Sequence, residues 1–96
     1  MKLNNKEYKI PELTFNTICK LEKKGVNLFA MDDGILGMVR GMVALAMDTD
    51  IETAGEEIEK HIADGGDLTE IMEEATEVIR ESGFFQSVMM KLATQN

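Results

Sequence analysis

One segment constrains the fold of this chain more than any other: GILGMVRGMVALAM, residues 34–47. Placed on a helix, it has a broad apolar face with further apolar residues on both flanks. The residues of this face are Ile35, Met38, Val39, Met42, Val43 and Ala46. Arg40 near the middle, and a length below the ~20 residues of a membrane span, argue against insertion in lipid. We therefore predict a central helix in a protein core, with Asp32 or Asp33 as its N-cap.

The length and composition indicate one globular domain. The chain has 96 residues, of which 44% are hydrophobic and 29% charged, and a chain of this size has room for a single core. The N-terminal residues MKLNNKEYKI lack the apolar run of a signal peptide, and the single Cys19 cannot form an internal disulfide. We expect one domain over residues 1–96, located in the cytoplasm and not in a membrane.

Charge is distributed unevenly along the chain. Residues 1–31 carry six Lys against three Glu, a net charge of +3, whereas residues 32–96 carry four basic against fifteen acidic residues, a net charge of −11. Together these give the net charge of −8. The acidic part would repel phosphates, so we expect no nucleic acid partner and favour a basic or apolar protein surface. The asymmetry is compatible with two solvated faces and with head-to-tail association of copies.

Residues 1–10 predict a β-hairpin. Its strands would be Lys2-Leu3 and Tyr8-Lys9-Ile10, around a polar stretch in which Asn residues tolerate the positive φ of tight turns. Pro11 would end the second strand, because it has no N–H for a ladder. Two strands alone are marginal in water, so we expect the hairpin to pack on helices or to pair with another chain.

A first helix is predicted over residues 15–24. Thr14 fits its N-cap, and Gly25 would end it by supplying a left-handed residue. The residues expected to point inward are Phe15, Ile18 and Cys19, with Leu21 as a further candidate, whereas Lys and Glu side chains would face water.

Two amphipathic helices should follow the central one. Thr49 and Asp67, each followed three residues later by Glu, have capping-box spacing and predict helices over residues 50–63 and 68–82. The second of these has the most regular apolar stripe: Leu68, Ile71, Met72, Ala75, Val78 and Ile79. Ser82-Gly83 would then break the helix, which gives a helical core over residues 14–82.

The C-terminal segment is more apolar than a chain of this size is expected to bury. Residues 84–94 would form a last helix whose apolar residues cover more than one face. Either this helix completes the core, or part of it contacts a partner helix or another copy of the chain. We predict a partner contact at Phe84, Phe85, Val88, Met89 and Leu92.

The sequence contains no recognisable catalytic or metal-binding constellation. His61 and Cys19 are the only histidine and the only thiol, and they fall on different predicted helices, which disfavours a His–Cys dyad. Residues 48–59 faintly resemble an EF-hand loop, but Thr53 stands where that loop needs Gly, and helix capping explains the same acids. We expect no enzymatic activity, no cofactor and no metal.

Two stretches resemble a known family. The run KIPELTFNTICKLE, residues 9–22, is similar to the opening of tail assembly chaperones encoded by long-tailed phages and prophages of Gram-positive bacteria. The run AGEEIEKHI, residues 54–62, which leads into Gly65-Gly66, looks similar as well. The layout of an acidic chain with a hairpin before its helices also resembles this family. Pattern and resemblance together predict a mainly α fold, with a short N-terminal β-hairpin followed by a four- to five-helix bundle.

The resemblance implies a non-enzymatic assembly factor that acts in the host cytoplasm and is not expected in the mature virion. Such proteins bind the tape measure protein, keep it soluble, help to recruit tail tube subunits and tend to form homo-oligomers. The alternative is a small acidic helical protein that regulates or inhibits a target by protein–protein binding, for example as a DNA mimic.

Overall fold

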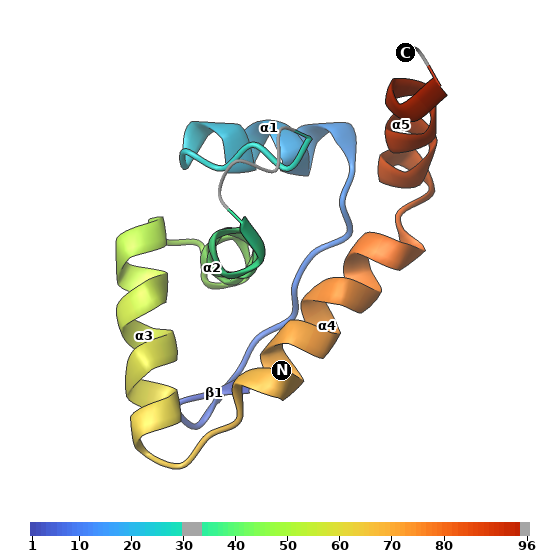
Figure 1. Cartoon of the computed structure of the whole chain (residues 1–96). Helices are drawn as coiled ribbons and strands as arrows, with labels where there is room; N and C mark the ends of the chain where they lie inside the picture. Colours follow the sequence, from blue (N-terminus) through green and yellow to red (C-terminus); the bar gives the residue numbers. More distant parts are fainter. Residues whose placement is uncertain (30–33, 95–96) are drawn as a thin grey trace.

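The computed structural model of the chain describes residues 1–29 and 34–94 (Figure 1). Within these residues the chain forms a two-stranded antiparallel hairpin and five helices, which confirms the predicted mainly α fold. The elements are β1 (Lys2–Leu3), β2 (Lys6–Glu7), α1 (Phe15–Lys23), α2 (Gly34–Met47), α3 (Ile51–Ala63), α4 (Leu68–Glu81) and α5 (Gly83–Thr94). Among the described residues, no helix combines the length and the apolar character needed to cross a bilayer.

α2 lies at the centre of the bundle, as its apolar sequence predicts. Figure 1 shows it nearly end-on, and it packs against α1, α3 and α4. Its buried residues are Val39, Gly41, Met42, Val43 and Ala44. Gly41 allows Val26 to approach the helix closely, since a Cβ at Gly41 would stand 2.7 Å from Val26 Cγ2. Arg40 turns towards α3 and lies over Gly55, where a Cβ would stand 3.2 Å from the Arg40 Cδ.

The first turn of α2 differs from the prediction. Ile35, expected on the buried face, is 62% exposed, and Leu36 is exposed beside it. The first buried residue of α2 is Val39, one turn later, so the first turn of the helix lies outside the core. The predicted N-cap, Asp32 or Asp33, falls outside the described residues.

The hairpin turns over only two residues. Asn4 and Asn5 form its tip with φ values of 51° and 68°, the left-handed conformation that two-residue hairpin turns require. β1 therefore pairs directly with β2, and the predicted second strand at residues 8–10 is wrong. Leu3 and Ile10 are nevertheless buried together in the core.

Polar contacts fix the hairpin to α3 and α4. The backbone N–H of Asn4 donates to His61 Nδ1 at 3.1 Å, and Asn4 Nδ2 donates to Glu57 Oε2 at 2.6 Å. The α-amino group of Met1 donates to Glu74 Oε1 at 2.9 Å. This hydrogen bond to Glu74 is the main reason why the pKa of the α-amino group is raised above its ordinary value. The hairpin is thus an integral part of the bundle.

α1 begins at the predicted cap, and its predicted inward face is buried except in the first turn. The Thr14 hydroxyl accepts from the Thr17 N–H at 3.3 Å, and Gly25 ends the helix with a φ of 93°. Phe15, predicted to point inward, is 65% exposed. The buried side chains are Ile18 and Leu21, both among the residues expected to point inward, and Cys19 is half-buried. The prediction is therefore wrong only for Phe15.

α3 and α4 follow the predicted ranges closely. The cap of α3 is Asp50, whose carboxylate accepts from the Thr53 N–H at 2.7 Å, so the prediction of Thr49 as the cap is wrong by one residue. Asp67 caps α4 and accepts from the Thr69 N–H at 2.8 Å. In both helices the carboxylate meets the positive end of the helix dipole, which stabilises the start of the helix.

Candidate interaction surface at the C-terminal helix

α5 projects from one end of the molecule. Figure 1 shows it beyond α1 and the end of α4, and α4 is its main neighbour. The molecule is elongated, with principal extents of 45 × 22 × 21 Å. An isolated helix as short as α5 is marginal in water, so α5 depends on the contacts that it makes.

Ser82 joins α4 to α5 and is almost fully buried. Its Oγ donates to the Leu13 carbonyl oxygen at 2.6 Å and accepts from the Phe85 N–H at 3.1 Å. The Ser82 carbonyl oxygen accepts from the Gln86 N–H at 3.0 Å, so Ser82 is the N-cap of α5. The predicted break at Ser82-Gly83 is therefore confirmed, and the hydroxyl fixes α5 to the segment before α1.

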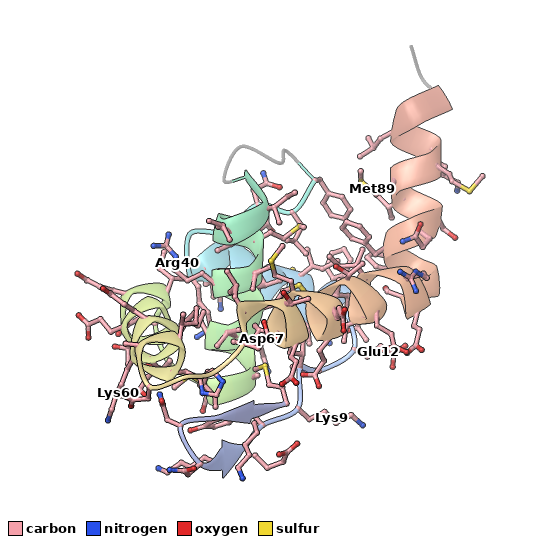
Figure 2. All side chains as sticks on the ribbon, turned by 60° about the horizontal axis from the view of Figure 1, so that its bottom comes forward. Lys9, Glu12, Arg40, Lys60, Asp67 and Met89 are labelled. Atoms are coloured by element: carbon pink, nitrogen blue, oxygen red, sulfur yellow. The ribbon has the colours of Figure 1, made fainter. Side chains whose placement is uncertain are left out.

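Two of the five predicted contact residues face the body of the molecule. The Phe85 side chain is only 5% exposed, and its ring stacks on that of Phe29 with 5.2 Å between the centroids. Met89, one turn later, packs against the core, and Figure 2 shows it pointing from α5 towards the other helices. Phe85 thus belongs to the core in this structure, because it covers Phe29, and its side chain is not part of the exposed surface.

The other three predicted residues form an outer row on α5. Phe84, Val88 and Leu92 are four residues apart, a spacing that places side chains on one face of a helix. Phe84 is 40% exposed, Leu92 is 46% exposed, and Val88 between them is half-buried. The apolar surface that the sequence predicts at α5 is therefore present, but it is narrower than the set of five residues.

α1 extends this surface by one residue. The exposed ring of Phe15 meets the ring of Phe84 edge to face, with 6.0 Å between the centroids. We call the four residues Phe15, Phe84, Val88 and Leu92 the outer strip. Edge-to-face pairing of this kind is favourable and leaves one face of each ring free to contact another apolar group.

A second apolar side chain of α5 points elsewhere. Met90 is 68% exposed, and it stands two residues beyond Val88, which on a helix is nearly the opposite side. Met90 therefore has apolar character and high exposure without belonging to the outer strip. This makes it a suitable control residue for any test of the strip.

The outer strip adjoins an acidic helix. Four exposed carboxylates follow the outer side of α4: Glu70, Glu73, Glu77 and Glu81. By contrast, Lys91 is the only charged residue of α5. An uncharged apolar strip next to a strongly charged helix can bind an apolar partner, while the charge opposes aggregation of the complex.

The described residues show no arrangement typical of catalysis. His61 Nδ1 accepts from Asn4 at the hairpin, whereas Cys19 lies on α1, at the opposite side of the molecule in Figure 1. In the part of the chain that the structure describes, no group of three or more His, Cys, Asp or Glu side chains is placed to hold a metal ion. What the surface at α5 offers is apolar contact.

Sequence reasoning missed Phe15 as a member of this surface. As an apolar residue directly after an N-cap, it was expected to point inward. No local signal marks it as exposed, because it stands three residues before the buried Ile18, a spacing that places both side chains on one face of a helix.

No protein-family model matches the chain, and neither a curated protein nor a solved structure matches it.

Proposed function

We propose that this chain is a non-enzymatic tail assembly chaperone, which binds the tape measure protein, keeps it soluble and helps to recruit tail tube subunits. Two observations support the proposal. The runs at residues 9–22 and 54–62 resemble this family, and the outer strip offers an exposed apolar surface on a projecting helix. The exposed strip is the observation on which the proposal depends most.

The mechanism follows from the chemistry of the surface. A tape measure protein is a long helical chain, and its apolar stripes aggregate when they are exposed. Side chains of such a stripe would pack along Phe84, Val88 and Leu92, in the manner of a helix laid against an apolar groove. The acidic residues of α3 and α4 would keep the complex in solution through their shared negative charge.

A co-expression experiment tests this proposal. The chain would be expressed together with the tape measure protein of the same phage or prophage, and the soluble fraction of the tape measure protein measured. The variant Phe84→Ser with Leu92→Ser removes the exposed ends of the outer strip, and we expect it to reduce the soluble fraction and the co-purified amount at least about fivefold, since buried apolar contacts dominate binding of this type.

The matched control is Met90→Ser, because this residue is equally apolar and more exposed but lies on the other side of α5. We expect this control to retain wild-type binding. Circular dichroism must show the same helical content in both variants. Equal losses in the two variants, or no capture of the tape measure protein by the wild-type chain, would contradict the proposal.

One observation favours a second function, a DNA mimic. The carboxylates of Glu70, Glu73, Glu77 and Glu81 form a regular exposed row along α4, and such a row could occupy a site made for phosphates. In that case the chain would compete with duplex DNA for a DNA-binding protein, and Glu73→Gln with Glu77→Gln would abolish the competition. Variants of the outer strip would leave it unchanged.

A further inference from the structure

A hollow of about 660 Å³ lies on the side of α1 that carries lysines. Pro11 and Leu45 supply apolar parts of its lining, from the segment before α1 and from the last turns of α2. Lys20, Lys23 and Lys24 line it as well, and Asp48 is the acidic residue of the lining. The lining of the hollow thus combines two apolar residues with three lysines, in a chain whose net charge is −8.

The position of one lysine is fixed by the fold. Lys24 Nζ donates to the Thr49 carbonyl oxygen at 2.7 Å, which ties the end of α1 to the turn after α2. Lys20 and Lys23 belong to the last turn of α1, where positive charge is favourable near the C-terminal end of the helix dipole. This effect explains why lysines occur at the helix end. The helix dipole does not explain why these lysines border a hollow that Pro11 and Leu45 also line.

We infer that this hollow binds an acidic segment of a partner protein, with an apolar side chain of the segment against Pro11 and Leu45 and its carboxylates beside Lys20 and Lys23. Charge complementarity carries the inference, because three of the ten basic residues of an acidic chain line one hollow together with Pro11 and Leu45. The surface is separate from the outer strip and does not depend on the proposed function.

A partner protein fits this hollow better than helix α4 of a second copy does. The acidic helix α4 could approach the lysines of another copy, but Ile71 and Ala75 lie in its own core. Among the described residues, α4 has no strongly exposed large apolar side chain next to its carboxylates. It could supply charge to the hollow without an apolar group to fill it.

Binding of a designed peptide tests the inference. The probe is a fluorescein-labelled amphipathic helical peptide rich in Glu and Leu, and fluorescence anisotropy measures its affinity for the full chain. Lys20→Glu with Lys23→Glu should weaken binding at least about fivefold, since two attractive contacts become repulsive. The same peptide with Gln in place of every Glu should bind the wild-type chain at least about fivefold more weakly, and added salt should weaken the Glu peptide.

The matched control is Lys2→Glu with Lys6→Glu, which changes the net charge by the same amount on the exposed hairpin. We expect it to bind the peptide like the wild type. Equal losses in both double variants would show general attraction and overturn the inference, as would no binding to the wild type. If sedimentation shows that the wild-type chain self-associates through Lys20 and Lys23, a second copy occupies the hollow and the inference fails.

Discussion

α4 and α5 are consecutive helices of similar length, but they differ in how far their apolar side chains are buried. α4 has one apolar stripe, with Ile71 and Ala75 in the core and carboxylates on the other side, and the remaining residues of the stripe are half-buried. α5 has apolar residues on several sides, and Phe85 is its one fully covered large side chain among the described residues. The apolar stripe of α4 is therefore buried or half-buried, whereas α5 leaves large apolar side chains exposed.

Binding capacity in this chain lies where the apolar residues exceed what the core can cover. A core of this size can cover one stripe of each surrounding helix, because helices share a limited interior. Apolar residues beyond that stripe must face water or a partner. In α5, Phe85 and Met89 dock the helix, and the remaining apolar residues form the outer strip with Phe15 on one side and leave Met90 exposed on the other.

Substitutions of two neighbouring phenylalanines distinguish the buried row of α5 from the outer strip by their effect on stability. Phe85→Ala leaves a cavity beside Phe29 and should lower the free energy of unfolding by about 3 kcal/mol or more, as is usual for a buried Phe. Phe84→Ala should lower it by only about 1 kcal/mol, mainly through the lost edge contact with Phe15. Urea denaturation of both variants measures the difference. Equal losses would mean that the two rows are not distinct.

The next prediction concerns Ser82, the residue that connects α4 to α5. Ser82→Ala removes the buried hydroxyl that bonds Leu13 and Phe85, so we expect a loss of about 1–3 kcal/mol in the free energy of unfolding. Ser87 lies on the exposed side of α5 and serves as the control, where Ala should change stability by less than about 0.5 kcal/mol. If Ser82→Ala lowers the free energy of unfolding no more than Ser87→Ala does, the Ser82 hydroxyl does not hold α5 to the bundle.

Local sequence was sufficient to predict most helices but not their orientation. The spacing of apolar residues and the capping residues place α4 and the centre of α2 correctly, because both signals depend only on residues close together in the sequence. The turn at Asn4 and Asn5 and the cap at Asp50 were misplaced by one or two residues, since neighbouring polar residues can serve the same role. The exposure of Phe15 depends on how α1 lies against α2, which no local pattern encodes.

The candidate surfaces were predictable to different degrees. The excess of apolar residues in α5 is visible in the sequence, so all three α5 residues of the outer strip were among those predicted. Their separation from Phe85 required the stacking on Phe29, a contact between segments far apart in the chain. The lysine hollow was not predicted at all, because Pro11, Lys20 and Leu45 come together only when α1 packs beside α2.

Hydrogen exchange compares the local stability of the two helices directly. The later turns of α5 project beyond the core, so their amides should open by local fraying without unfolding of the bundle. We expect residues 88–92 to exchange at least about tenfold faster than residues 71–75 of α4. A bound partner on the outer strip should remove much of this difference. Equal protection in the free chain would show that α5 is as firmly held as α4.

The smallest expected effect concerns how the helices begin. α3 starts with a charged cap, Asp50, and the N–H of Thr53 that donates to it is the main reason why the pKa of this carboxyl lies below its ordinary value of 3.8. A carboxyl with a lowered pKa in the folded state adds stability above its unfolded pKa, and this contribution disappears as the pH falls through the folded pKa. α5 starts with the hydroxyl of Ser82, which carries no charge. Acid should therefore weaken the start of α3 and leave the start of α5 unchanged.

Asp50→Asn isolates this effect, because Asn retains a cap acceptor but does not titrate. We expect the variant to be less stable than the wild type at neutral pH, and the difference to shrink as the pH falls below about 4, the region where Asp residues take up protons. Urea denaturation at a series of pH values measures this convergence. A difference that stays constant down to pH 2 would mean that the Asp50 charge does not contribute. The contrast between titrating and neutral caps would then be lost, and α3 and α5 would differ only in what their side chains cover.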